Sequence, residues 1–318
     1  MKTNLMKTIF SICIFIFCIT NVSNAWNGAG HRIVAAIAYY SLKKENPAAL
    51  ARAVALLKHH PWYSDQSQWP QKLADVSPES EGITLFMLAA TWPDDIKIIK
   101  TPYEKHENWH FVDNPYIKPG SSVKRKRAAS PNAFDAYQWA TNQLQSSTAT
   151  DSAKATALAW MLHIIGDIHQ PLHNAEMYSD DLPNGDIGGN LLCVAGNSQH
   201  TNLHAFWDDL LGPSSLTFND CKAKARQLLD SFPENSLHEL TKNKIISEWS
   251  TMESFPTAEE SAYLNGNISY SILGSDAKEC SSGPELSSDY ISHAQSIANR
   301  RIALAGLRVR DYIIANVK

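Results

Sequence analysis

The sequence predicts a mainly α-helical fold, with one multi-helix domain and a short β-hairpin. Apolar residues recur at helical spacing through most of the chain, whereas the alternating pattern of strands is rare. Residues 1–25 have the features of a leader, and without them 293 of the 318 residues remain. That length is enough for one large core and no linker divides it, so we expect one domain over residues 26–318.

Eight segments have the apolar periodicity of helices. They cover residues 30–42, 48–58, 82–92, 134–144, 153–168, 221–232, 237–255 and 288–317. Residues 190–195 are expected in the short hairpin. Two stretches rich in Gly, Ser, Pro or Asn, residues 115–131 and 180–202, are expected to be loops.

Residues 1–25 resemble a secretory signal peptide. Two lysines precede an apolar stretch at residues 9–19, and Ser23 and Ala25 place small residues at the −3 and −1 positions. The apolar stretch is too short to span a bilayer. We therefore expect cleavage after Ala25, a secreted or periplasmic protein, and no membrane segment in the mature chain.

The charge of the mature chain excludes one way of binding nucleic acid. Loss of two lysines with the leader reduces the 28 basic residues to 26, against 32 acidic ones, for a net charge of −6. Such a protein is poorly suited to hold long nucleic acid by its overall charge alone. Any positive charge that meets a phosphate should be local, and metal ions are the obvious source.

Three cysteines remain after leader cleavage, and export permits a disulfide. They are Cys193, Cys221 and Cys280. Three is an odd number, so one thiol stays free or pairs elsewhere. We expect the bridge to join Cys221 and Cys280. Three cysteines are too few for a thiolate zinc framework.

Two segments repeat one metal-binding design. His163 and Asp167 are four residues apart, and so are His204 and Asp208. On a helix this spacing puts an imidazole and a carboxylate on one face, about 5–6 Å apart at Cβ, where both reach one ion. Apolar residues surround both pairs, and buried charges are costly unless they are paired or bound to metal.

Further candidate ligands lie nearby in the sequence. His173 follows Pro171, which ends the helix and lets the histidine turn toward a second ion. His169 is a rival, but it lies off the face of the first pair, and we interpret it as structural. Asp94 and His110 each stand close to a bulky aromatic residue, as a buried site requires.

The predicted mature N-terminus adds an unusual donor. Cleavage after Ala25 would make Trp26 the first residue, five positions before His31. A free α-amine has a pKa near ~8 and can lose its proton to bind a metal, whereas an internal amide cannot. The amine and carbonyl of Trp26 could therefore join His31 around one ion.

Together these segments resemble the S1/P1 nuclease family, whose members are zinc-dependent nucleases and 3′-nucleotidases. The motifs occur in family order: an N-terminal Trp followed by Gly-His, then WPD, WHFVD, HIIGDIHQPLH, GGN and NLHAFWD. The resemblance covers almost the whole mature chain. It implies a mainly helical fold, shared with zinc phospholipase C, with three zinc ions at the bottom of a cleft.

The resemblance also assigns the ligands. The first zinc would take Asp94, His110, His163 and Asp167. The second would take the amine and carbonyl of Trp26, His31 and Asp167, whose carboxylate would bridge the two ions. The third would take His173, His204 and Asp208.

The same resemblance implies the substrate contacts. Phe111 would stack on a base, Asp113 would hydrogen-bond its edge, and Asn190 of the GGN stretch would contact the substrate. Lys97 stands where the family often has arginine, and it keeps the positive charge near the phosphate but loses the bidentate fork. Asp94 could orient the attacking water as well as bind metal.

We therefore expect a zinc enzyme that cleaves single-stranded DNA and RNA to 5′-phosphates and dephosphorylates 3′-nucleotides. It would act as a monomer, without a stable protein partner. One alternative is a phosphoesterase of the zinc phospholipase C type, although an aromatic residue and a carboxylate suit a base better than a diacylglycerol. Another is a secreted zinc-binding protein without activity.

Overall fold

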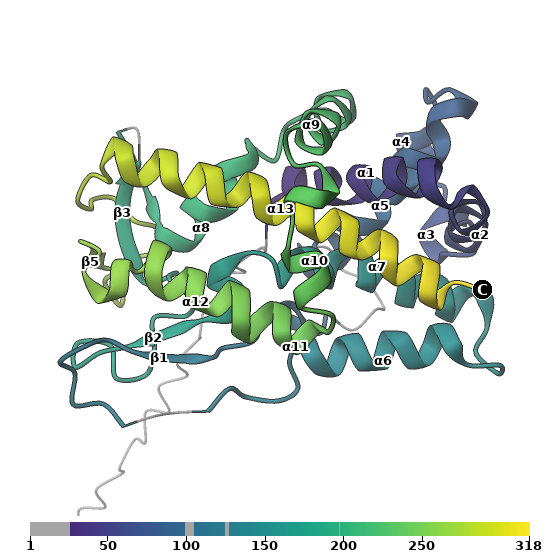
Figure 1. Cartoon of the computed structure of the whole chain (residues 1–318). Coiled ribbons are helices and arrows are strands. Elements are labelled where there is room, and N and C mark those ends of the chain that lie inside the picture. Colours follow the sequence, from purple (N-terminus) through teal and green to yellow (C-terminus); the bar gives the residue numbers. More distant parts are fainter. Residues whose placement is uncertain (1–25, 99–104, 125–126, 197) are drawn as a thin grey trace, which may run out of the picture.

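The structure, a computed structural model, describes residues 26–98, 105–124, 127–196 and 198–318. The predicted signal peptide lies outside these described residues. Most of the described chain is helical and only small sheets accompany the helices (Figure 1), which confirms the predicted fold class. None of the described helices combines the length and the apolar character that a membrane span requires.

The secondary structure runs from α1 to α13, with five short strands. The α-helices are α1 (Gly28–Glu45), α2 (Pro47–Leu57), α3 (Pro61–Ser64), α4 (Trp69–Leu73), α5 (Pro78–Ile98), α6 (Ala133–Gln145), α7 (Asp151–Asp167), α8 (Leu203–Asp208), α9 (Phe218–Ser231), α10 (Glu239–Lys242), α11 (Ile246–Glu248), α12 (Phe255–Thr257) and α13 (Ser288–Asn316). The strands are β1 (Pro115–Ile117), β2 (Glu176–Tyr178), β3 (Leu192–Gly196), β4 (Gln199–Asn202) and β5 (Ser271–Ile272).

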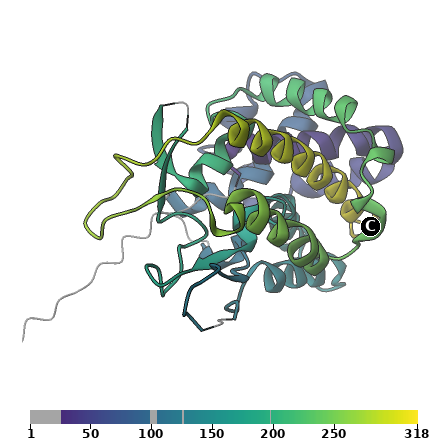
Figure 2. The same cartoon turned by 60° about the vertical axis from the view of Figure 1, so that its left-hand side comes forward.

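Helix α1 lies at the centre of the core. It begins after Asn27, whose side chain accepts hydrogen bonds from the backbone N–H groups of Ala29 and Gly30. It packs against α13, α5 and α9, while α5 packs against α7 and α7 against α6. The long α13 runs diagonally across the molecule and packs on α1 (Figures 1 and 2). The elements that carry His31, Asp94 and His163 are therefore direct neighbours.

The predicted hairpin is present, with its first strand shifted along the chain. β3 pairs with β4 in antiparallel register, Cys193 opposite Asn202, and β5 adds to the other side of β3. The stretch 180–202 was predicted to be a loop, but its second half forms β3 and β4 of this sheet. Likewise residues 115–117 of the other predicted loop form β1, which pairs in parallel with β2.

The prediction of a single helix over residues 237–255 is wrong, because α10 ends at Lys242 and the next helix, α11, begins at Ile246. The carboxylate of Glu248 accepts hydrogen bonds from the backbone N–H groups of Lys244 and Ile245, and so starts a new helix there. At the break, Asn243 donates from its side chain to Glu253 at 2.7 Å and accepts from the Trp249 indole at 3.1 Å. Tertiary hydrogen bonds thus override the helical periodicity of this segment.

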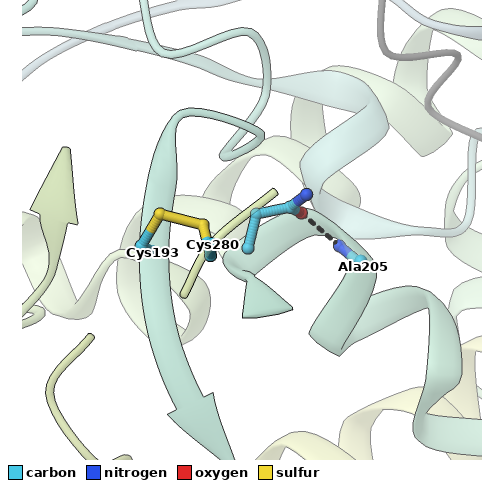
Figure 3. The surroundings of a disulfide bond; sticks show 4 residues. Cys193, Ala205 and Cys280 are labelled. Carbon is cyan, nitrogen blue, oxygen red and sulfur yellow. Dashed lines mark hydrogen bonds between the residues drawn. A yellow bond between two sulfur atoms is a disulfide. The ribbon is translucent and has the colours of Figure 1, made fainter. Parts of the chain in front are cut away.

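The expected Cys221–Cys280 disulfide is also wrong. Cys280 pairs with Cys193 of β3, with 5.4 Å between their Cα atoms (Figure 3). Cys221 is a buried free thiol on α9, where its sulfur lies 4.0 Å from the backbone oxygen of Ala29 in α1. The thiol of Cys221 therefore packs in the α1–α9 contact.

Candidate metal centre and active site

Helix α7 supplies the central pair of candidate ligands. Its N-terminus is capped by Thr150, and its apolar C-terminal half is buried in the core. His163 and Asp167 lie there on one face, both fully buried, with His163 Nε2 3.2 Å from Asp167 Oδ2. The Nδ1–H of His163 donates to the backbone oxygen of Ala90 in α5 at 2.7 Å, so Nε2 is the atom that faces the site.

The two oxygens of Asp167 face different histidines. Oδ2 lies 3.2 Å from His110 Nδ1 and 3.2 Å from His163 Nε2, whereas Oδ1 lies 3.2 Å from His31 Nε2. Candidate metal groups therefore form on both sides of one carboxylate. One contains His31, His163 and Asp167, the other Asp94, His110 and His163, and in each the ligand atoms lie within 4.8 Å of one another.

His31 can enter this centre because residue 166 has no side chain. A Cβ atom on Gly166 would lie 3.0 Å from His31 Nδ1, closer than the ring could tolerate without moving. The imidazoles of His31 and His163 stack in parallel, with ring centroids 3.8 Å apart. The glycine between the two ligand residues of α7 thus brings α1 close enough for the histidines to meet.

A third group lies beside the first two. His173 comes from the short 3₁₀ helix Pro171–Asn174, and His204 and Asp208 are on α8. The Nε2 atoms of the two histidines are 2.9 Å apart, and Asp208 Oδ2 lies 3.5 Å from His204 Nε2. The Nδ1–H of His173 donates to the backbone oxygen of His110 at 2.7 Å, which links this group to the first two.

Gly188, in the stretch that contains the GGN motif, holds the other histidine of the third group. Its backbone oxygen accepts the Nδ1–H of His204 at 2.7 Å. Its φ of +58° is a left-handed conformation that favours glycine, and a Cβ there would lie 2.8 Å from the backbone oxygen of Leu172. The first glycine of the motif thus has a structural reason, which is to orient His204.

The donor atoms fit a divalent ion such as zinc. His173 and His204 both use Nδ1 as a donor, so each neutral ring has a lone pair on Nε2, and these lone pairs point at each other unless a cation lies between them. In the central groups, His31 Nδ1 and Nε2 and Asp167 Oδ1 are buried and make no hydrogen bond of good geometry with any described residue. Imidazole nitrogens and carboxylate oxygens are among the ligands that zinc takes in proteins.

The electrostatics of the third group also favour a bound cation. Burial, followed by the nearby His173, lowers the pKa of His204 to about 3, and burial lowers the pKa of His173, so both rings stay neutral. Burial, together with Asp209 and other carboxylates, raises the pKa of Asp208 well above its usual range. A cation would displace the proton that Asp208 otherwise holds, and metal affinity should therefore increase with pH.

Asp94 is the one ligand candidate of the central groups that reaches solvent. Its side chain is 12% exposed, against at most 1% for His31, His110, His163 and Asp167. Lys97, one helical turn later on α5, is buried and places Nζ 2.8 Å from Asp94 Oδ1. Burial raises the pKa of Asp94, but Lys97 and the three histidines outweigh burial and hold this pKa well below its usual range. Asp94 is therefore an ionised carboxylate at the open side of the centre.

The remaining predicted residues are placed less centrally. The Trp26 side chain is fully buried. The next residue, Asn27, donates its backbone N–H to the backbone oxygen of Asp208 at 3.4 Å, and this hydrogen bond places the segment before α1 next to α8. Phe111 directly follows His110 and is partly exposed. Asp113 is also partly exposed and lies near Glu176. Asn190 lines a cavity together with His204 and Asp208.

His169 is excluded as a ligand, as predicted. Its Nδ1–H donates to the oxygen of Ile165 at 2.6 Å, and its Nε2 accepts from Arg308 at 2.6 Å. One functional position was missed: the side chain of Gln170 donates to Asp208 Oδ1 at 2.8 Å and so orients that carboxylate. Its place between the two ligand histidines of HIIGDIHQPLH was the available signal.

Comparison with known proteins identifies the family of the chain. The model of the S1/P1 nuclease family matches residues 26–317. The chain is 25% identical to Endonuclease 3 of Arabidopsis thaliana over 299 residues, which cover 92% of this chain and 88% of that one. It is 35% identical to Nuclease S1 of Aspergillus oryzae over 122 residues, 37% of this chain and 39% of that one. It is 26% identical to Nuclease P1 of Penicillium citrinum over 186 residues, 56% of this chain and 63% of that one. The chain therefore belongs to the S1/P1 nuclease family.

Proposed function

We propose that this protein is an exported, zinc-dependent nuclease and 3′-nucleotidase. It hydrolyses phosphodiester bonds of single-stranded DNA and RNA to 5′-phosphates, and it removes the phosphate from 3′-nucleotides. The observation that carries the proposal is the position of Asp167, whose two oxygens face two different histidine groups beside a third group of the same composition. Three ions in such an arrangement could act on one phosphate.

The mechanism divides the work between metal and protein. Zinc held by these groups would lower the pKa of a bound water toward ~7 and neutralise phosphate charge. Asp94, ionised and partly exposed at the open side, accepts a hydrogen bond from the attacking water and orients it. Lys97 keeps Asp94 ionised and places a positive charge beside the phosphate. His163, His173 and His204 hold their tautomers because each donates its Nδ1–H to a backbone oxygen.

Base recognition is assigned to Phe111 and Asp113. The partly exposed ring of Phe111 follows a ligand residue directly, so a base stacked on it would hold its 3′-oxygen near the metal groups. Burial, and then the nearby Glu176, raises the pKa of Asp113 to about 7. Asp113 therefore changes near neutral pH from a hydrogen-bond donor to an acceptor toward the base edge.

The N-terminus completes the second metal group in this proposal. With the leader removed after Ala25, the α-amine and carbonyl of Trp26 would join His31 and Asp167. The backbone N–H of Asn27 donates to the backbone oxygen of Asp208, a candidate ligand, and this hydrogen bond supports a position of Trp26 close to the centre. Export, a single catalytic domain over residues 26–318 and a monomeric state belong to the same proposal, and the disulfide is consistent with an oxidising compartment.

The test uses protein exported through its own leader, incubated with single-stranded DNA, RNA, 3′-AMP and phosphatidylcholine. Turnover of the first three is expected, with loss after chelation and recovery on addition of zinc. Turnover of phosphatidylcholine alone would instead indicate a phospholipase. A zinc-loaded sample that is inert on all four substrates would contradict an enzymatic role.

A matched comparison tests the N-terminal ligand. A variant that retains one methionine before Trp26 should fold but bind one zinc fewer per chain, because its ligand nitrogen is an amide. Zinc per chain, measured by elemental analysis, should differ between the two proteins. Equal zinc content and equal activity would show that the Trp26 amine is not a ligand.

A further inference from the structure

A cavity of about 390 Å³ opens beside the third metal group. This volume falls within the range of small-molecule sites. His204 and Asp208 form part of its wall, so a ligand in the cavity would touch the metal group directly. The Phe111–Asp113 segment contributes none of the lining residues. The cavity is therefore not lined by the segment proposed to bind a base, and it adjoins the third metal group.

The wall of the cavity is rich in hydrogen-bonding side chains. Three amides, those of Asn27, Asn190 and Asn202, line it together with the hydroxyls of Thr201 and Ser214. Asn27 donates its amide to Asp209 at 2.6 Å and to the backbone oxygen of Gly212 at 2.7 Å, so the floor of the cavity is held in place. Amides and hydroxyls match the mixed donors and acceptors of a sugar or a base edge.

Lys278 lies at the exposed side of the cavity, on a loop that is anchored to β3. At one end of the loop the N–H of Leu273 donates to the oxygen of Leu191 at 3.0 Å, and at the other the N–H of Ala195 donates to the oxygen of Pro284 at 2.8 Å. The disulfide joins Cys280 to β3, and Cys280 itself lines the cavity, close to Ala205 (Figure 3). Within the described chain Lys278 makes no ion pair, and its position two residues before Cys280 limits its movement.

The two proposed substrates, a 3′-nucleotide and a polynucleotide, differ in what is attached to the scissile phosphate. In a 3′-nucleotide the scissile phosphate carries one nucleoside and otherwise only oxygen. In a polynucleotide the same phosphate carries a second nucleoside on its 5′-oxygen, and a further phosphate follows. With its first base on Phe111, a polynucleotide needs a further space beside the metal groups for the second nucleoside, and the cavity is a space that adjoins one of these groups.

We propose that this cavity is a subsite for the nucleoside on the 5′-oxygen side of the scissile phosphate, with Lys278 near the next phosphate of the chain. The inference rests on the proposed nuclease function and adds to it a site used by polynucleotides and not by 3′-mononucleotides. Glu279 and Asp209 also line the cavity. The attraction for a second phosphate therefore depends on Lys278 and on the neighbouring metal ions.

The experiment compares kcat/KM for 3′-AMP with kcat/KM for a single-stranded oligonucleotide in two independent variants. Lys278→Glu replaces an attractive surface charge by a repulsive one, so it should lower the oligonucleotide value about tenfold and leave that for 3′-AMP within about twofold. Ser214→Leu adds apolar bulk at the exposed edge of the cavity and should act in the same direction. For Lys278→Glu, the fall should shrink at high salt.

Matched controls lie elsewhere on the chain. Lys242→Glu changes an exposed lysine on α10, and Ser215→Leu changes the exposed neighbour of Ser214 that does not line the cavity. Neither should alter the ratio of the two kcat/KM values. The subsite proposal is overturned if Lys278→Glu and Ser214→Leu leave the ratio of the two kcat/KM values unchanged, which includes an equal fall in kcat/KM for both substrates. Failure of the unaltered protein on both substrates would instead overturn the nuclease function itself.

Discussion

Two buried clusters of histidine and carboxylate side chains in this protein balance their charges in opposite ways. In the candidate metal centre, His31, His110 and His163 surround Asp167, and Lys97 is paired with Asp94. In the second cluster, Arg301 and Arg308 from α13 surround Glu253. The first cluster gathers acceptors and lone pairs, whereas the second matches each acceptor with a donor.

The arginine cluster is almost fully satisfied by protein atoms. Glu253 Oε1 accepts from Asn243 at 2.7 Å and from Arg308 at 2.6 Å, and its Oε2 accepts from Arg301 and, at 2.9 Å, from Arg308. His169, at the edge of this cluster, accepts from Arg308. A buried carboxylate with this many charge-assisted donors needs no further cation.

The comparison separates structural histidines from candidate metal ligands. His169 and His163 are on adjacent turns of the same segment, and both are fully buried. His169 has a protein partner at each ring nitrogen that is not a candidate ligand. His163 has a backbone partner at Nδ1, but its Nε2 faces two other candidate ligands, Asp167 Oδ2 at 3.2 Å and His110 Nδ1 at 2.8 Å. Unmatched acceptors in a buried cluster, rather than burial or charge alone, indicate an ion site.

The largest expected effect is on the metal centre, through Asp167→Asn. A neutral amide oxygen is a poor bridge between two cations, so the variant should lose both zinc and activity. The fall in activity should exceed the roughly 10–100-fold typical of residues that only support a ligand. Zinc per chain and kcat/KM for 3′-AMP are the measurements. Full zinc content with normal turnover would contradict the bridging role.

The matched change in the arginine cluster is Glu253→Gln. It leaves two buried guanidinium groups without their carboxylate, which should reduce the free energy of unfolding by about 3–5 kcal/mol. Urea unfolding measures this loss. Zinc per folded chain should stay unchanged, because Glu253 contacts no ligand candidate. A loss of zinc with unchanged stability would show that the two clusters are not distinct.

Asp186 tests a third way to neutralise a buried carboxyl, which is to hold a proton. It is fully buried, accepts from the backbone N–H of Met177 at 2.8 Å, and burial raises its pKa from 3.8 to about 7. The folded state therefore keeps a proton that the unfolded state releases, so stability falls as pH increases from about 4 to 7, by a few kcal/mol at most.

Asp186→Asn should remove that part of the pH dependence. Asparagine cannot ionise and its oxygen can still accept from Met177, so the variant should gain stability relative to the unaltered protein at pH 8 but not at pH 4. Urea unfolding at both values measures the difference. Asp230→Asn, at an exposed carboxylate, is the control. Parallel pH profiles for the Asp186→Asn variant and the unaltered protein would exclude the protonated carboxyl.

The smallest expected effect lies just outside the metal centre, at Phe111→Ala. Loss of base stacking should cost roughly 1–3 kcal/mol of binding and therefore raise KM for 3′-AMP and single-stranded DNA. Bis(4-nitrophenyl) phosphate needs only the metal centre, so its turnover should hardly change. An equal loss of kcat/KM on all three substrates would mean that Phe111 packs against the metal centre instead of binding a base.

Much of the candidate centre could be predicted from local sequence. His163 with Asp167, and His204 with Asp208, are neighbours on single helices, so the helical repeat alone brings them together. The mainly helical class and the hairpin followed from periodicity for the same reason. The rotation of a helix likewise set His169 apart from His163 before any tertiary contact was known.

The predictions that failed depended on contacts between distant segments. Cys193 and Cys280 are 87 residues apart, and the pairing of β3 with β5 and the hydrogen bond from Ala195 to Pro284 bring them together. Cys221 instead faces α1. The helix predicted over residues 237–255 breaks because Asn243 and Glu253 bond across the break. Local periodicity carries no information on such pairs.

The sequence by itself determined which ligand types are present, which of them share a helix face, and to which family the motifs point. Only the tertiary structure decided that one carboxylate, Asp167, faces His31 of α1 and His110 of another segment with separate oxygens. It also decided that Lys278 lines the same cavity as Asn27 and His204. Helix geometry repeats every few residues and can be read locally, whereas the approach of α1 to α7, or of a disulfide-anchored loop to α8, depends on packing across the whole core.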